Sequence, residues 1–193
     1  QKYVIENTRL GIPLFLAEEA PHGHMAIGTT VFPTGIGMAA TWSPTLIEEV
    51  GNVIAKEIRS QGAHISYGPV LDLSRDPRWS RVEETFGEDP VLSGRLGAAM
   101  ILGLGSGDLS CEYATIATLK HFLAYAVPEG GQNGNYASVG TRDLHENFLP
   151  PFREAIDAGA LSVMTSYNSI DGVPCTANHY LLTQLLRNEW RFR

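Results

Sequence analysis

Four short apolar runs, each roughly 50 residues after the previous one, constrain the fold of this 193-residue chain more than any other feature of its sequence. They have the length and composition of buried β-strands. Helical patterns of apolar residues lie between them, and this alternation predicts a parallel sheet with helices packed outside it. The runs are Ile12–Leu16, Ile65–Leu71, Ile116–Leu119 and Leu161–Met164.

The first intervening helix carries clear start and stop signals. Ser43 is a favourable N-cap, and Pro44 suits the first helical position. Gly62 follows the last apolar position and ends the pattern. The apolar residues that recur at helical spacing are Leu46, Val50, Val53, Ile54 and Ile58.

Three further helices follow from the same kind of pattern. One begins near Pro90, one near Asp143 with a bend at Pro150 and Pro151, and one after Asn178 as its cap. Their apolar faces are Leu92, Leu96 and Met100; Leu144, Phe148, Phe152 and Ile156; and Leu181, Leu182, Leu185 and Leu186.

A parallel α/β arrangement of this kind is either doubly wound or a closed (β/α)8 barrel, and we favour the barrel. The sequence holds four or five strand–helix units, whereas a complete barrel has eight in about 250 residues. We therefore expect residues 1–193 to form a single partial domain, the central part of a TIM-type barrel that is truncated at both ends.

Composition excludes several classes of protein. The net charge is -7 and the 14 Lys and Arg residues are scattered, which disfavours binding to nucleic acid or to an anionic membrane surface. No apolar stretch approaches the roughly 20 residues that span a bilayer, and no signal peptide is recognisable at the start. Cys111 and Cys175 have neither zinc-ligand nor disulfide-framework spacing, and we expect both to be buried thiols.

Polar and ionisable side chains follow each apolar run directly. The carboxyl ends of parallel strands meet at one edge of the sheet, so these groups should line the same pocket opening. Carboxylates, amines, imidazoles and a phenol can together hydrogen-bond a ring of hydroxyls, which predicts polyol recognition. The groups are Glu18, Glu19 and His22; Asp72, Arg75 and Asp76; Lys120 and His121; and Ser166, Tyr167 and Asn168.

Two other interpretations of the ionisable residues remain open. A metal-dependent hydrolase on a similar barrel would use Glu18, His22, His24 and His121 as ligands. The acidic residues Glu83, Glu84, Glu88 and Asp89 offer an internal pair of catalytic carboxylates. They precede a helix, however, where the helix dipole already favours acidic groups.

Four segments, in order, resemble the signature blocks of family 3 glycoside hydrolases of the β-glucosidase type. They are RLGIPLFLAEEAPHGH, DPRWSRVEETFGEDP, ATLKHFLAY and LSVMTSYNSIDGVPCTANHYLLTQLLRNEW. The resemblance implies retaining hydrolysis of β-glycosidic bonds, with release of glucose or a similar sugar from the non-reducing end. It implies no cofactor and no metal, a β-linked oligosaccharide or glucoside as the partner, and secretion or a periplasmic location.

The resemblance also assigns roles to particular residues. Glu19 occupies the position of an acidic residue that holds outer hydroxyls of the innermost sugar, and Arg81 that of a sugar-binding arginine. Lys120 and His121 match a Lys-His pair that grips neighbouring hydroxyls. Many members have an arginine roughly ten residues later, whereas Gln132 stands closest to that place here.

Met164 and Tyr167 match apolar and phenolic contacts near the site of attack. The family's nucleophilic aspartate is expected shortly after Arg193, and its general acid/base in a later domain, so we expect no catalytic residue within the chain. A sugar-binding piece without catalysis would share every motif and is the remaining alternative. The preferred sugar, the leaving group and the oligomeric state are not specified by the sequence.

Overall fold

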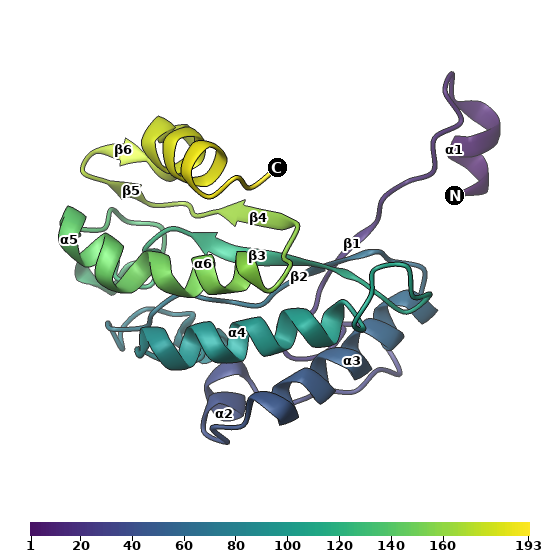
Figure 1. Ribbon diagram of the computed structural model, residues 1–193, viewed down its shortest axis with the longest axis horizontal. Coiled ribbons are helices and arrows are strands. Elements are labelled where there is room, and N and C mark those ends of the chain that lie inside the picture. Colours follow the sequence, from purple (N-terminus) through teal and green to yellow (C-terminus); the bar gives the residue numbers. More distant parts are fainter.

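A computed structural model describes residues 1–193, and its centre is a four-stranded parallel sheet (Figure 1). The strands are β1 (Ala17–Glu19), β2 (Ile65–Tyr67), β3 (Ile116–Phe122) and β4 (Ser162–Thr165), in the order β1-β2-β3-β4. Sequential order of parallel strands joined by helices fits a partial α/β barrel, as the alternation of apolar runs predicts.

The strand register brings the polar residues together at one edge. Glu19 lies opposite Tyr67 in β1 and β2. Beyond Tyr67 the chain stays beside β3: Val70 bridges to Lys120, and the Leu71 amide donates to the Lys120 carbonyl over 2.7 Å. Asp72 therefore lies beside the end of β3, although it is outside the short regular strand β2.

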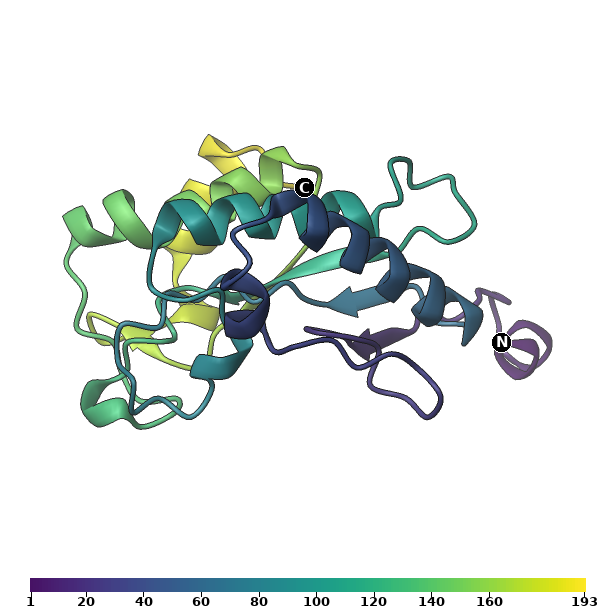
Figure 2. The same cartoon turned by 90° about the horizontal axis from the view of Figure 1, so that it is seen from below.

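Three helices cover one side of the sheet, and loops lie on the other side (Figure 2). The helices are α3 (Pro44–Ser60), α4 (Pro90–Leu104) and α6 (Leu149–Asp157), and α4 packs against both of the others. Ser43 caps α3 by accepting from the Leu46 amide over 3.3 Å, which confirms the predicted start. Asp89 caps α4 by accepting from the Leu92 amide over 2.7 Å.

Glycines let α3 and α4 cross closely. A Cβ atom on Gly103 would lie 2.2 Å from the Glu48 carbonyl oxygen, and one on Gly51 would lie 2.9 Å from that of Met100. Any larger side chain at either position would push the helices apart.

The third predicted helix consists of three consecutive segments. They are α5 (Thr141–Asp143), a π-helical turn (Leu144–Phe148) and α6. The wide turn ends at Phe148, two residues before Pro150; Pro150 and Pro151 lack the amide hydrogens that a regular ladder needs. The last helix is a π-helical segment (Tyr180–Glu189), and the Asn178 side chain accepts from the Leu181 amide over 3.1 Å, as predicted.

Three details of the sequence interpretation are wrong. Ile12–Leu16 is exposed extended chain, and the strand begins only at Ala17; Pro13 cannot donate to a ladder, and backbone pairing with the next strand starts at the Leu16 carbonyl. Leu46 and Val53 are exposed on α3, so its buried face is rotated from the predicted one. Cys111 is an exposed thiol, whereas Cys175 is buried as expected.

Several short elements have no counterpart in the sequence interpretation, because each is too short to carry a periodic pattern. They are α1 (Lys2–Asn7), α2 (Gly35–Ala39), the antiparallel hairpin of β5 (Ser169–Ile170) and β6 (Val173–Pro174), and the 3-10 turns Val82–Glu84, Glu129–Gly131 and Cys175–Ala177.

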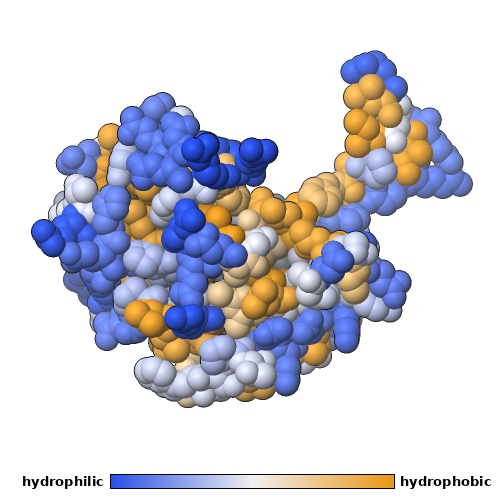
Figure 3. All heavy atoms as spheres, in the orientation of Figure 1, coloured by the Kyte–Doolittle hydropathy of each residue, from blue (hydrophilic) through white to orange (hydrophobic).

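The core lies between the sheet and its helices, while apolar residues of the first thirty-odd positions remain in water. In Figure 3, the N-terminal segment projects from the body and carries apolar surface along its length. No helix in the structure is long and apolar enough to cross a membrane. The exposed apolar residues of this region include Ile12, Leu14, Phe15, Met25, Ile27 and Val31.

We expect the 193-residue chain on its own to self-associate, since β1 and β4 are unpaired sheet edges and the projecting segment exposes apolar side chains. Light scattering during size-exclusion chromatography should give a mass above the 21.0 kDa of one chain. Phe15→Ser should reduce the association, because Phe15 is exposed and supports no core packing. A monomer with sharp, dispersed amide signals would contradict the expectation.

Candidate functional site

The central feature of the site is a buried lysine at the end of β3. The Lys120 side chain is only 2% exposed, and its Nζ atom lies 2.7 Å from Oε2 of Glu19 at the end of β1. Glu19 itself is 50% exposed. β2 lies between these two strands, so the ion pair spans the sheet edge and joins residues that are 101 positions apart. An ammonium this deeply buried requires a carboxylate partner.

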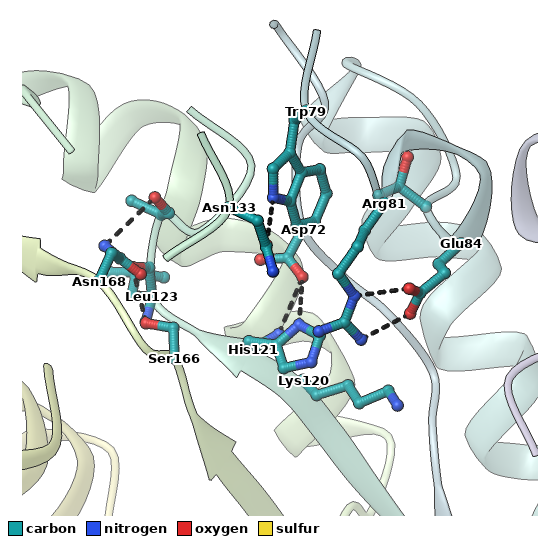
Figure 4. Close-up of polar contacts among 12 residues, drawn as sticks. Asp72, Trp79, Arg81, Glu84, Lys120, His121, Leu123, Asn133, Ser166 and Asn168 are labelled. Atoms are coloured by element: carbon teal, nitrogen blue, oxygen red, sulfur yellow. Dashed lines mark hydrogen bonds and ion pairs between the residues drawn. The ribbon is translucent and has the colours of Figure 1, made fainter. Parts of the chain in front are cut away.

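His121, the next residue, is held by Asp72. The Oδ2 atom of Asp72 accepts from the His121 backbone amide over 3.1 Å and lies 2.8 Å from the ring Nδ1. The Asp72 side chain is fully buried and that of His121 is 5% exposed. Figure 4 shows His121 beside Lys120, with the Asp72 carboxylate above the ring and joined to it by dashed lines.

Arg81 forms the third charged contact, a bidentate ion pair with Glu84. Its Nη2 atom lies 2.8 Å from Oε2 of Glu84, and its Nε atom donates to Oε1. Burial opposes ionisation of Glu84, but the Arg81 guanidinium, with Lys120 and His121 nearby, outweighs it and lowers the pKa of Glu84. The same hydrogen bonds raise the pKa of Arg81, which stays cationic.

A buried tyrosine connects Arg81 to His121. The ring of Tyr125 lies edge-on to that of His121 with centroids 4.8 Å apart, and the Arg81 guanidinium carbon is 5.5 Å from its centroid. Trp79 and Tyr167 also contact this ring edge-on, at 5.1 and 5.8 Å. Glu19, Arg81, Lys120, His121 and Tyr167 therefore belong to one cluster rather than to separate faces.

The loop after β3 approaches the cluster through Asn133. The Trp79 indole donates to Oδ1 of Asn133 over 2.9 Å, whereas the adjacent Gln132 is exposed and its side chain makes no hydrogen bond. Nearby, Asp76 accepts from the side chain and backbone amide of Arg78, which lowers the pKa of Asp76 to about 2. Trp79 and Arg78 thus shape their loop.

Residues after β4 divide by burial. Ser166 and Asn168 are buried and hydrogen-bond the backbone of Leu123, which fixes the segment leading to Tyr125. Tyr167, between them, is 77% exposed and borders the cluster. Met164 is half-buried on β4 and has no hydrogen bond or aromatic contact with the cluster.

Three residues of the cluster have no binding role assigned to them in the sequence-based site. Asp72 appears there only as a polar residue after a strand, Glu84 only as part of an acidic run, and Tyr125 not at all. The position of Asp72 directly after an apolar run was a usable signal. Tyr125 could not be identified, because an aromatic residue five positions beyond Lys120 has no distinctive spacing.

The alternative interpretations of the acidic and histidine residues find no support in the geometry. No three His, Cys, Asp or Glu side chains lie close enough together to hold a metal ion. His22 is instead engaged by the Phe32 carbonyl, with 3.1 Å between Nδ1 and the oxygen, and His121 by Asp72. Asp89 is a helix cap, and Glu84 is bound to Arg81.

A cavity of about 740 Å³ lies apart from the cluster. It is bordered by the segment from Tyr136 to Thr141, the β5–β6 hairpin and Tyr180, and contains none of the ion pairs. Within the cluster, Lys120, His121 and Asp72 are buried, whereas Glu19 and Tyr167 reach solvent. The candidate site is the cluster, because its cationic and anionic side chains converge at the strand ends.

The cluster can recognise hydroxyl groups. Lys120 and Arg81 supply donors, the Glu19 and Glu84 carboxylates supply acceptors, and His121 supplies either according to its protonation. Each cation has a carboxylate partner, which leaves little net charge and suits an uncharged polyol better than an anion or a cation.

The comparisons with known proteins agree on one family. The model of the glycosyl hydrolase family 3 N-terminal domain matches residues 1–193. The chain is 36% identical to a periplasmic β-glucosidase of Salmonella typhimurium over 193 residues, which are 100% of the chain and 25% of that protein. It is 42% identical to a β-xylosidase of Formosa agariphila, over 96% of the chain and 27% of that protein.

Solved structures are equally similar. A β-glucosidase involved in saponin metabolism from intestinal bacteria superposes with a TM-score of 0.96 at 42% identity, over 99% of the chain and 26% of that structure. The Listeria innocua β-glucosidase in complex with glucose gives 0.94 at 39% identity, over 100% of the chain and 26% of that structure. The chain spans about a quarter of the length of the relatives it matches.

Substitutions at the buried ion pair should have unequal effects on stability. Lys120→Met removes the buried charge and leaves Glu19 half-exposed to water, so the free energy of unfolding should change by no more than about 1 kcal/mol. Glu19→Ala leaves the ammonium buried without its partner and should cost about 2 kcal/mol, less than in a fully enclosed pair because Glu19 is half-exposed.

Chemical denaturation of the whole protein measures both free energies of unfolding. The exposed pair of Arg142 and Glu146 provides the control, since Glu146→Ala should leave stability nearly unchanged. Equal losses for Lys120→Met and Glu19→Ala would contradict the asymmetry.

Proposed function

Because the chain belongs to glycosyl hydrolase family 3, we propose that the whole protein hydrolyses β-glycosidic bonds and releases glucose or a similar sugar from the non-reducing end of β-glucosides. The observation that carries the proposal is the convergence of Glu19, Lys120, His121 and Arg81 at the carboxyl ends of β1 to β3. Among the relatives, the name β-glucosidase and the name β-xylosidase both occur, so either sugar is compatible with the chain.

The polar cluster is suited to fixing one pyranose. Glu19 is half-exposed beside Lys120, so the pair offers an acceptor and a donor to adjacent hydroxyls. His121 adds a third group, and Tyr167 provides an exposed ring at the border. Several hydrogen bonds from strand ends orient the sugar, and orientation is itself a large part of the rate enhancement in glycoside hydrolysis.

The proposed reaction proceeds with retention of configuration. One carboxylate attacks the anomeric carbon, and a carboxylic acid about 5 to 5.5 Å away protonates the leaving oxygen. Water then cleaves the glycosyl-enzyme ester, with the second group acting as base. Within residues 1–193, the carboxylates of Glu84 and Asp72 are already paired with Arg81 and His121. We therefore assign both catalytic roles to residues beyond Arg193.

The proposed setting is the periplasm or the exterior of the cell. A periplasmic relative supports this placement. We further propose a β-linked oligosaccharide or glucoside, rather than nucleic acid or membrane lipid, as the partner of the protein.

Hydrolysis of 4-nitrophenyl β-D-glucoside and β-D-xyloside tests the proposal. The whole protein should release nitrophenol from at least one of them, and proton NMR should show the β-anomer of the sugar as the first product. The 193-residue chain should release none, because it carries neither proposed catalytic carboxylate. Inactivity of the whole protein on both substrates, initial release of the α-anomer, or activity of the 193-residue chain would contradict the proposal.

A further inference from the structure

Asp72 is a fully buried carboxylate whose side chain hydrogen-bonds only two atoms, both in His121. We propose that Asp72 is a positioning residue that fixes the tautomer and the orientation of His121. In this arrangement the neutral ring carries its proton on Nδ1 and presents Nε2 as a hydrogen-bond acceptor to a sugar hydroxyl. The proposal deepens the proposed function and rests on it for the identity of the ligand.

The hydrogen-bond network determines the tautomer. The backbone amide of His121 is a donor at every pH, so the Asp72 Oδ2 atom that it contacts over 3.1 Å is an acceptor. The ring Nδ1 lies 2.8 Å from the same oxygen. With the carboxylate as acceptor, the proton of that contact belongs to Nδ1, which leaves Nε2 with a free lone pair.

Packing fixes the orientation of the ring. Tyr125 lies edge-on to the His121 ring with centroids 4.8 Å apart, and only 5% of the His121 side chain is exposed. If the ring rotated away, Asp72 would keep a buried charge with only the backbone amide as a partner, which is unfavourable. Asp72 and Tyr125 therefore hold the ring from two directions.

The backbone in turn holds Asp72. The preceding residue, Leu71, donates its amide to the Lys120 carbonyl over 2.7 Å, and Val70 bridges to Lys120. The second carboxylate oxygen, Oδ1, is buried and has no hydrogen-bond partner. A carboxylate buried with one oxygen unsatisfied is costly for stability, which points to a role for the other oxygen in holding His121.

Kinetics of the whole protein test the proposal through four variants. Asp72→Asn should lower kcat/KM for 4-nitrophenyl β-D-glucoside by roughly 10- to 100-fold, because the amide lacks the charge that holds the Nδ1 proton. His121→Ala should lower it at least as much, and the double variant should lie within about twofold of His121→Ala. Asp157→Asn, at an exposed pair on α6, is the matched control and should behave as the unaltered protein.

Monodeoxy substrates separate positioning from a general structural effect. With the 2-, 3-, 4- and 6-deoxy derivatives of the same glucoside, Asp72→Asn and His121→Ala should lose their effect on the same single derivative, the one that lacks the hydroxyl bound by Nε2. Additive effects in the double variant, or equal losses on all four derivatives, would overturn the proposal. An inactive unaltered protein would instead count against the proposed function.

Nitrogen-15 NMR of histidine-labelled unaltered protein gives a readout that needs neither activity nor a stable Asp72 variant. In alkaline buffer, the His121 signal should show a protonated Nδ1 and an unprotonated Nε2. His121→Gln assigns the signal by its disappearance. The opposite tautomer, or an equal mixture of the two, would overturn the proposal.

Discussion

The ion pair between Lys120 and Glu19 is the interaction on which the geometry of the site depends. Lys120 lies near the end of the most buried strand of the sheet, where an unpaired ammonium would be strongly unfavourable. A carboxylate from another part of the chain is needed to balance it. Glu19 does so from β1, across β2, and this requirement fixes the position of two strand ends relative to each other.

The neighbouring groups follow the same rule of local charge balance. Arg81 is paired with Glu84, and His121 with Asp72, while the ring of Tyr125 fills the space between Arg81 and His121. Such a site presents many donors and acceptors at fixed positions with little net charge. These are the properties needed to hold an uncharged sugar by its hydroxyls, where each misplaced polar group is costly.

The sequence predicted the larger elements because they carry long or regular patterns. The helix after Ser43 and the strand before Lys120 are examples, since capping residues and buried apolar runs have direct physical causes. The predicted start of the first strand is wrong, because an apolar run that contains Pro13 cannot form a regular ladder of backbone hydrogen bonds. The division of the helix near Asp143 into three segments cannot be predicted from the spacing of apolar residues, since two prolines widen its turn.

For the site, the sequence predicted which residues end the strands but not how they pair. Glu19, Lys120 and His121 were named from their positions, and the register brings them together. Tyr125 contacts the ring of His121. Asp72 pairs with the same histidine because the chain stays beside β3 after the regular part of β2 has ended. That contact is long-range, and nothing local in the sequence encodes it. The contribution of Gln132 and Met164 stays a prediction.

A crystal structure of the whole protein with glucose bound would test the central claim, that one pyranose is held by the groups at the carboxyl ends of β1 to β3. The account predicts ring hydroxyls within hydrogen-bonding distance of Glu19, Lys120 and His121 at the same time. Glucose bound at a different surface, with these three side chains unchanged and untouched, would contradict it.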